Sequence, residues 1–223
     1  MKKQWKWSDN VIETCSNRYT VFYVLLIAVV LTACGSLTQS DKPVVTTWWL
    51  KPYVGVPQAA APDPALPVAL TLSVVPGLDS EQILTLSNDA ELRPYAGARW
   101  VDHAPELLAS LIGRSLEASG RYEVFPVHAD SGSGSCDLQL ELREFFADIG
   151  SQGATTGVRI AIHGRFQCES AAPVILQSCA SIPVRGEAMH GIVAAFQAAV
   201  DQVMEGLLAS MIAAQPVAHS DCQ

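Results

Sequence analysis

Cysteine is the residue type in this chain whose spacing most clearly indicates chemistry. The six cysteines lie at positions 15, 34, 136, 168, 179 and 222. No two of them form a Cys-x-x-Cys pair and no nearby histidine completes a tetrahedral ligand set, so we expect no metal site. In an oxidising compartment Cys136, Cys168, Cys179 and Cys222 can form disulfides, and the alternative is that they are free buried thiols.

A predicted hairpin narrows the pairing of these four cysteines. Residues 137–147 and 157–168 alternate as strands do, and the Gly-rich residues 150–157 between them are typical of a hairpin loop. If the two strands pair about a centre near residue 152, the numbers of opposite residues add up to about 304, which places Cys136 against Cys168 within bridging distance. Cys179 and Cys222 then pair by default and tie the C-terminal tail to the sheet.

The histidines and the Gly-rich loop match no catalytic motif. Asp102 and His103 are neighbours in sequence, and neighbours on a turn do not form a catalytic relay. No serine lies in a Gly-x-Ser-x-Gly elbow, and the chain has no His-Glu-x-x-His motif and no P-loop. The loop 150–157 lacks the Lys and the following helix of a phosphate-binding loop. We therefore expect a protein that is not an enzyme and that needs no cofactor.

Cys34 differs from the other cysteines in what precedes it. Residues 19–33 form an uncharged apolar run, which is short for a membrane-spanning helix of ~20 residues and typical of a signal peptide. The run ends in Leu31-Thr32-Ala33-Cys34-Gly35. This segment resembles the lipobox of bacterial lipoproteins, in which the Cys thiol receives a diacylglyceryl group and the signal peptidase cuts before it.

The lipobox resemblance implies a cleaved signal peptide over residues 1–33 and a lipidated tether over residues 34–43. Several acyl chains, at ~0.8 kcal/mol per buried methylene, would hold the chain stably at a membrane. Gly35 replaces the Asp that retains enteric lipoproteins in the inner membrane, so by analogy we expect the periplasmic face of the outer membrane. The alternative is an uncleaved N-terminal anchor in which Cys34 is an ordinary small residue.

The excess of acidic residues argues against nucleic acid as a partner. Without residues 1–33 the chain keeps 10 basic and 20 acidic side chains. Such an acidic body repels the phosphates of nucleic acids, and it is a poor match for anionic lipid headgroups. We therefore expect no nucleic acid partner, and we expect membrane contact through the lipid anchor rather than through a basic patch.

Hydrophobic periodicity indicates the elements that position these residues. Strand patterns cover residues 44–50, 68–74, 83–86, 91–95, 122–127, 137–147, 157–168 and 174–184. Helical spacing predicts helices over 104–119, with Pro105 in the first turn and Gly120 after the end, and over 187–213. A Pro/Ala-rich connector, residues 52–67, cannot pair inside a sheet. We expect an α+β domain over 44–215, an antiparallel sheet with two main helices packed on one face, and a C-terminal tail over 216–223.

Three segments in this order behind a lipobox resemble the ABC-type transport auxiliary lipoprotein component family. The first is the aromatic strand 47–52, and the second is the strand 70–75 with its turn 76–79. The third is residues 95–100, with a Trp before the helix, followed by Gly120-Arg121-Tyr122-Glu123-Val124. The Pro/Ala-rich insert around 57–67 departs from the family pattern and leaves the position of the first strand open.

The resemblance implies a role rather than a reaction. It implies a non-catalytic periplasmic subunit of an ABC/Mce-type transporter that moves lipids or other hydrophobic molecules between the inner and outer membranes. The partners would be a periplasmic Mce-domain protein with an inner-membrane permease and ATPase, and the chain would dock the Mce component to the membrane, with a homo-oligomeric ring as one arrangement. The alternatives are an envelope lipoprotein that regulates a peptidoglycan synthase or another periplasmic partner, and a lipid carrier with its own cavity.

Aromatic residues and arginine are the candidates for partner contact, because they dominate interface hot spots. The candidates are Trp48, Trp49, Tyr95, Arg99 and Trp100. The alternative is that the aromatic side chains simply fill the core, which is at least as good an interpretation for Trp100.

Overall fold

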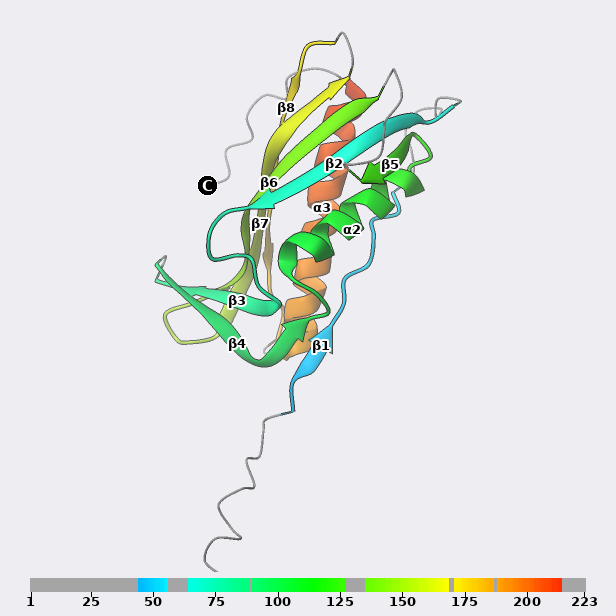
Figure 1. Cartoon of the computed structure of the whole chain (residues 1–223). Coiled ribbons are helices and arrows are strands. Elements are labelled where there is room, and N and C mark those ends of the chain that lie inside the picture. The colour runs from blue at the N-terminus through cyan, green and yellow to red at the C-terminus, as the bar shows by residue number, and fades with distance from the viewer. Residues whose placement is uncertain are drawn as a thin grey trace, which may run out of the picture. The chain divides into compact units, whose positions relative to one another are not determined.

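The described part of the chain forms one sheet and two helices (Figure 1). The computed structural model describes residues 44–55, 64–88, 90–126, 135–168, 171–186 and 188–213. The helices are α2 (Ala104–Ala118) and α3 (Met189–Ala213). The strands are β1 (Thr46–Trp48), β2 (Leu66–Val74), β3 (Gln82–Ser87), β4 (Glu91–Trp100), β5 (Tyr122–Pro126), β6 (Cys136–Ile149), β7 (Thr155–Cys168) and β8 (Val174–Pro183). The α+β class and both helices are confirmed.

The sheet is mixed and mostly parallel, so the prediction of an antiparallel sheet was wrong. Strand β6 lies at its centre, parallel to β2 and β3 on one side and antiparallel to β7 on the other. The β1–β4 and β2–β5 pairs are parallel as well, whereas β3–β4 and β7–β8 are antiparallel. The antiparallel pairs are those whose strands are joined by short turns. Such turns can be recognised in the sequence. Parallel pairs need long crossover connections, and alternation of residue types says nothing about strand direction.

The β6–β7 hairpin has the register that the sequence predicted. Cys136 lies opposite Cys168, and this register holds as far as Leu142 and Ile162. A bulge between Leu142 and Glu144 then shifts the pairing by one residue. The disulfide between Cys136 and Cys168 is present. It therefore links two strands at the open end of the hairpin.

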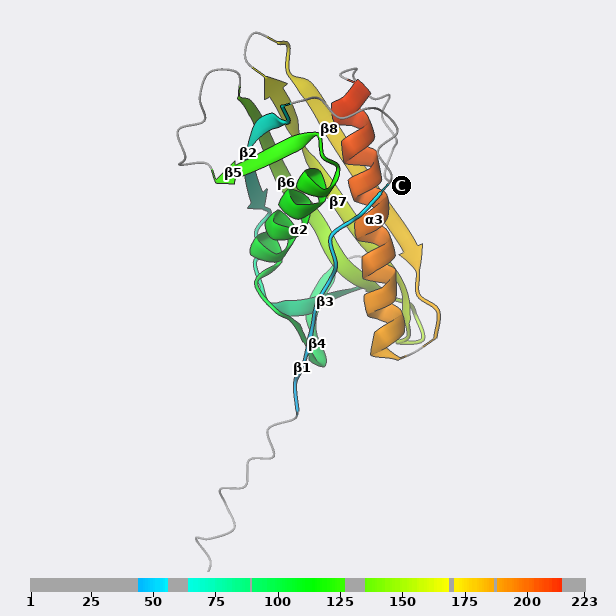
Figure 2. The ribbon, with the colours of Figure 1, turned by 90° about the vertical axis from the view of Figure 1, so that its right-hand side faces the viewer.

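Both helices cover the same face of the sheet (Figure 2). Helix α2 packs over β2 and β5 and buries its predicted apolar stripe, and Gly120, at φ +69°, follows its end. Helix α3 packs over β7 and β8, where the Ser178 hydroxyl donates to the Val203 carbonyl at 3.0 Å. By length and composition alone α3 could span a membrane, but eleven of its residues are buried. It is the core helix that the sequence predicted.

An aromatic cluster joins the end of β4 to β6 and α3. The Trp100 ring lies 5.4 Å from the Phe145 ring and 5.0 Å from the Phe196 ring, measured between centroids. The Phe145 and Phe196 rings are also 5.0 Å apart. These three residues come from β4, β6 and α3, so the cluster fixes the end of β4 beside the start of α2.

The strand β4 is longer than predicted and β1 is shorter. Residues 91–95 were expected as a short edge strand, but β4 continues to Trp100 through Gly97, whose φ of +75° few other residues adopt. The predicted first strand, 44–50, pairs only over Thr46–Trp48, where it runs parallel to the end of β4. Of the predicted connector 52–67, residues 56–63 lie outside the described residues, and β2 begins at Leu66.

A segment that we call the N-terminal strap, residues 48–55, crosses the space between α2 and α3 (Figure 2). Leu50 is fully buried there. The Gln197 side chain of α3 binds the Lys51 backbone on both sides, accepting from its N–H at 2.8 Å and donating to its carbonyl at 3.0 Å. The Tyr53 N–H donates to the Ser115 hydroxyl of α2 at 2.9 Å. The strap therefore ties the start of the fold to both helices.

Candidate functional site

The five residues predicted to contact a partner do not lie on one surface. Trp100 is only 1% exposed and belongs to the aromatic cluster, which is the alternative that the sequence left open for it. Trp48 and Tyr95 are partly buried against the core, and Trp48 meets the His190 ring edge-on at 4.8 Å. Trp49, in contrast, is 64% exposed. Of the three tryptophans, Trp49 is the one available to a partner.

An apolar groove lies beside Trp49, along one side of α2. It has a volume of about 210 Å³. Val101, which is 52% exposed, lies in its wall. The residues that line this Trp49 groove are Trp49, Val101, Asp102, Glu106, Leu107, Ser110, Leu111 and Arg114. An exposed Trp and an exposed Val beside one groove are more informative than either alone, because contiguous apolar surface marks interaction sites.

Hydrogen bonding and side-chain alternation near the start of α2 bring the residues of the Trp49 groove together. The Val101 N–H donates to the Trp48 carbonyl at 3.0 Å, which joins the end of β1 to the link between β4 and α2. Alternation along the extended chain then turns Trp49 outward between the more buried Trp48 and Leu50. Glu106, Ser110 and Arg114 follow one another at intervals of four along α2, so they form the outer rim of the groove.

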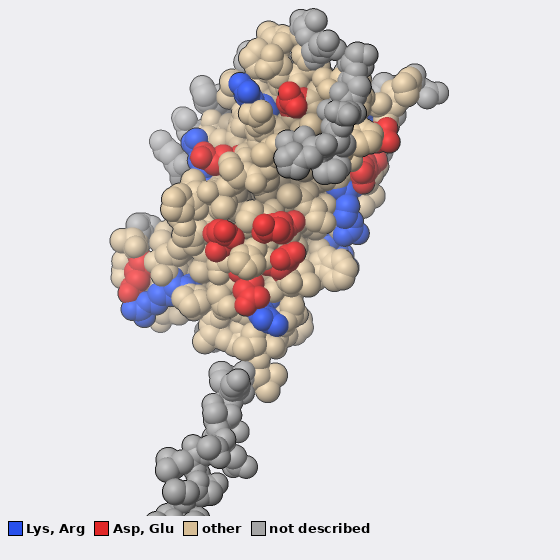
Figure 3. Space-filling model, in the orientation of Figure 1, with Lys and Arg blue, Asp and Glu red and all other residues tan. Residues whose placement is uncertain are grey.

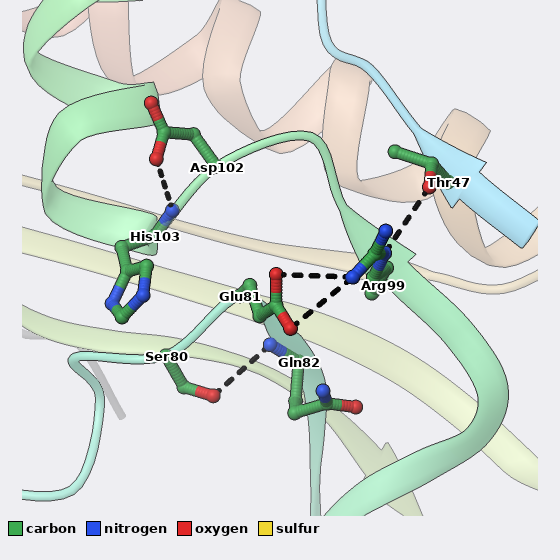
Figure 4. A network of polar contacts seen from close by, with 7 residues as sticks. All are labelled: Thr47, Ser80, Glu81, Gln82, Arg99, Asp102 and His103. Carbon is green, nitrogen blue, oxygen red and sulfur yellow. Dashed lines mark hydrogen bonds and ion pairs between the residues drawn. The ribbon is translucent and has the colours of Figure 1, made fainter. Parts of the chain in front are cut away.

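A polar network surrounds the start of α2 (Figure 4). The Arg99 side chain contacts both Glu81 carboxylate oxygens at 3.3 Å and donates to the Thr47 hydroxyl at 3.2 Å. It therefore joins β1, β4 and the loop before β3. Arg99 does not line the Trp49 groove, but it joins the strands that lead to Trp49 and Val101. The sequence predicted Arg99 as a contact residue but did not indicate Glu81 as its partner.

His103 pairs with Asp79 next to this network. Its Nδ1 lies 2.9 Å from the Asp79 Oδ1. The hydrogen bond to Asp79, with the charges of Asp79, Glu106 and Glu81, raises the pKa of His103 above its usual value. Ligand atoms of Asp79, His103 and Glu106 lie within 4.8 Å of one another, a spacing that could hold a metal ion. All three are exposed, and exposed acidic groups commonly lie this close without an ion, so spacing alone does not establish a metal site.

The carboxylates around the start of α2 form an acidic patch, which we define as Asp79, Glu81, Asp102 and Glu106. Acidic side chains gather on this face of the molecule in Figure 3. Arg99 balances Glu81, and His103 is bonded to Asp79. The remaining two carboxylates, Asp102 and Glu106, line the Trp49 groove. The sequence did not reveal this patch, because the loop carrying Asp79 and Glu81 meets α2 only in the folded chain.

A second groove, of about 400 Å³, lies on the helix-free face of the sheet. Its arginines are hydrogen-bonded to neighbouring side chains: the Arg143 Nε donates to the Glu141 carboxylate at 2.6 Å, and the Arg165 Nε donates to the neutral Gln139 side-chain oxygen at 3.2 Å. Burial, together with the Arg143 charge, lowers the pKa of His163. These contacts are those of a solvated sheet face, and they point to no particular ligand.

The remaining predicted site residues are cysteines. Cys179 is disulfide-bonded, and its predicted partner Cys222 lies outside the described residues. Cys34, the predicted lipidation site, and the rest of the predicted signal peptide and tether also lie outside them. Lipidation at Cys34 therefore stays a prediction from the sequence.

Comparison with known proteins gives one family match and several solved structures of similar fold, including two crystal structures. The model of the family described as "ABC-type transport auxiliary lipoprotein component" matches residues 53–207. No curated protein matches the chain. A crystal structure of a Xanthomonas campestris protein from family DUF330 is 23% identical and has a TM-score of 0.57, over 76% of this chain and 99% of that one. A crystal structure of an uncharacterised protein is 10% identical at the same TM-score, over 75% and 99%. Both structures show similarity of fold alone.

Proposed function

We propose a docking function, because this chain belongs to the ABC-type transport auxiliary lipoprotein component family. In this proposal the chain is a non-catalytic subunit, held by lipid on Cys34 at the periplasmic face of the outer membrane. It docks the periplasmic Mce-domain component of a transporter whose inner-membrane permease and ATPase drive the movement of lipids or other hydrophobic molecules. The chain needs no cofactor for this role beyond its own covalent lipid.

The observation that carries the docking role is the exposed Trp49 groove next to the place where the chain enters the fold. Trp49 and Val101 keep large apolar surfaces in water, which costs free energy unless a partner covers them. Trp is also the residue type most enriched in interface hot spots. The tether over residues 34–43 spans at most about 35 Å when fully extended, so a lipid on Cys34 would hold this groove near the membrane.

The packing of the strap favours docking over a carrier with its own lipid cavity. A lipid chain that entered between α2 and α3 would have to replace the strap. Leu50 is fully buried there, and the Lys51 backbone is bonded to Gln197. The space between the helices is thus already filled by the chain itself. Family membership in turn favours transport over regulation of a peptidoglycan synthase.

Affinity purification of the full-length chain from detergent-solubilised membranes tests the docking role. We expect the Mce-domain protein, the permease and the ATPase to co-purify. Trp49→Ala should reduce their recovery at least about tenfold, as loss of a hot-spot residue does. Val54→Ala is the matched control, because Val54 is 80% exposed and lies outside the groove. Equal recovery with both variants, or no transporter subunit with the wild-type chain, would contradict the proposal.

A further inference from the structure

We propose that the Trp49 groove binds a cationic segment of the periplasmic partner. One apolar side chain of that segment sits on Leu107 and Leu111 beside Trp49, and its Lys or Arg side chains face Asp102 and Glu106. This inference rests on the proposed docking function and adds to it the chemistry of the bound segment.

The apolar part of the groove defines where the anchor sits. Leu107 and Leu111 are one helical turn apart and form its floor, while Trp49 and Val101 project beside them. A volume of about 210 Å³ accommodates one or two side chains rather than a whole lipid. The apolar contact is therefore with a short anchor, as in a helix or strand that lies along α2.

The charged rim defines the polarity of the segment. Within the described part of the chain, Asp102 and Glu106 form no ion pair, whereas the neighbouring Glu81 and Asp79 contact Arg99 and His103. Asp102 accepts only a backbone hydrogen bond, from His103, at 2.9 Å. An acidic residue in the first helical turn has a structural role through the helix dipole, which accounts for Glu106. The helix dipole explains neither why an acidic residue occurs at position 102 nor why Trp49 is exposed beside it.

Arg114 gives the bound segment a direction. It lies at the far end of the groove from Asp102, about 12 Å along α2 from Glu106 by the rise of an α-helix. A segment with its cations over the start of α2 and an uncharged or acidic end near Arg114 matches the whole rim. The reverse orientation would place the cations of the segment beside Arg114, and this repulsion costs affinity.

Charge also argues against two other occupants of the groove. A second copy of this chain would present another acidic body, with 20 acidic and 10 basic side chains after residues 1–33 are removed. An anionic membrane surface would face Asp102 and Glu106 directly. A cationic protein segment is the occupant that both the apolar floor and the acidic rim attract.

The test is binding of the purified periplasmic domain of the Mce-type partner to the lipidated full-length chain at increasing NaCl concentrations. The combined Asp102→Asn and Glu106→Gln variant should bind about tenfold more weakly at low salt, and its affinity should depend less on salt. Asp137→Asn with Glu123→Gln is the matched control, since it removes two exposed carboxylates that lie on strands and do not line the groove. The control should bind like the wild type.

The outcomes separate this inference from the docking function. If the wild-type chain binds the partner and the neutralised variant keeps the same affinity and salt dependence, the segment is not cationic and the inference fails alone. If the wild-type chain binds no partner at any salt concentration, both fail. A change of oligomeric mass in Trp49→Ala without partner would assign the groove to a second copy. Trp49-dependent binding of a chain that begins at Gly35 to vesicles of phosphatidylcholine and phosphatidylglycerol would assign the groove to lipid.

Discussion

At the scale of single residues, three tryptophans that are close in the fold have three different roles. Trp100 is buried against Phe145 and Phe196, Trp48 is partly buried against His190, and Trp49 stands in solvent. The sequence identified all three as candidates and gave burial in the core as an equally good interpretation for Trp100, but it did not separate Trp48 from Trp49. Exposure depends on which way each side chain points and on what packs above it, and those packing elements are far away in the sequence.

The pKa of His103 reports on the electrostatics of the acidic patch. Its pKa is raised chiefly by the hydrogen bond to Asp79, so the folded chain binds this proton more tightly than the unfolded chain does. The resulting small stabilisation is present below the ordinary His pKa and is lost as the pH rises through the raised one. We expect Asp79→Asn to move the pKa of His103 toward its ordinary value, as measured by NMR titration of the ring.

The control for this titration is Glu91→Gln. Glu91 is exposed and its ion pair is with Arg93 on the same strand, so its removal should leave the His103 titration unchanged. An unchanged His103 pKa in Asp79→Asn would show that the contact between the two side chains does not persist in solution.

At the scale of elements, local signals account for what the sequence predicted. Helix α2 followed from its apolar stripe, Pro105 and Gly120, and the Cys136–Cys168 pairing followed from the short β6–β7 turn. The parallel pairs of β6 with β2 and β3 join segments separated by much of the chain, and no local pattern encodes them. The acidic patch was missed for the same reason, since it forms where the loop before β3 meets the start of α2.

The strap is the element whose hold on the helices can be measured. Gln197→Ala removes both hydrogen bonds to the Lys51 backbone, and we expect the free energy of unfolding to fall by about 1 kcal/mol, because this site is exposed and water replaces part of the loss. Urea denaturation measures the change. Gln202→Ala, at an exposed position on the same helix, is the control and should have little effect. Equal stability of the two variants would mean that the strap is not held by this contact.

At the scale of the whole molecule, the sequence predicts an anchor and the structure shows what that anchor would hold. The domain has one sheet face covered by two helices, with the strap between the helices and the Trp49 groove beside α2. Its acidic surface is not built to bind anionic lipid by itself. In the proposed function, membrane attachment through Cys34 and partner contact through the groove are separable, so we expect a variant to remove one without the other.

Recruitment of the partner to vesicles tests the central claim most directly. The lipidated chain would be reconstituted into vesicles, the periplasmic Mce domain added, and the vesicles sedimented. We expect the Mce domain to pellet with wild-type chain and to pellet about tenfold less with Trp49→Ala. It should stay in the supernatant with a chain that begins at Gly35, which has neither the apolar run 19–33 nor the lipid. If the Mce domain stays in the supernatant with wild-type chain, or pellets equally with the chain that begins at Gly35, this chain is not a lipid-anchored docking subunit.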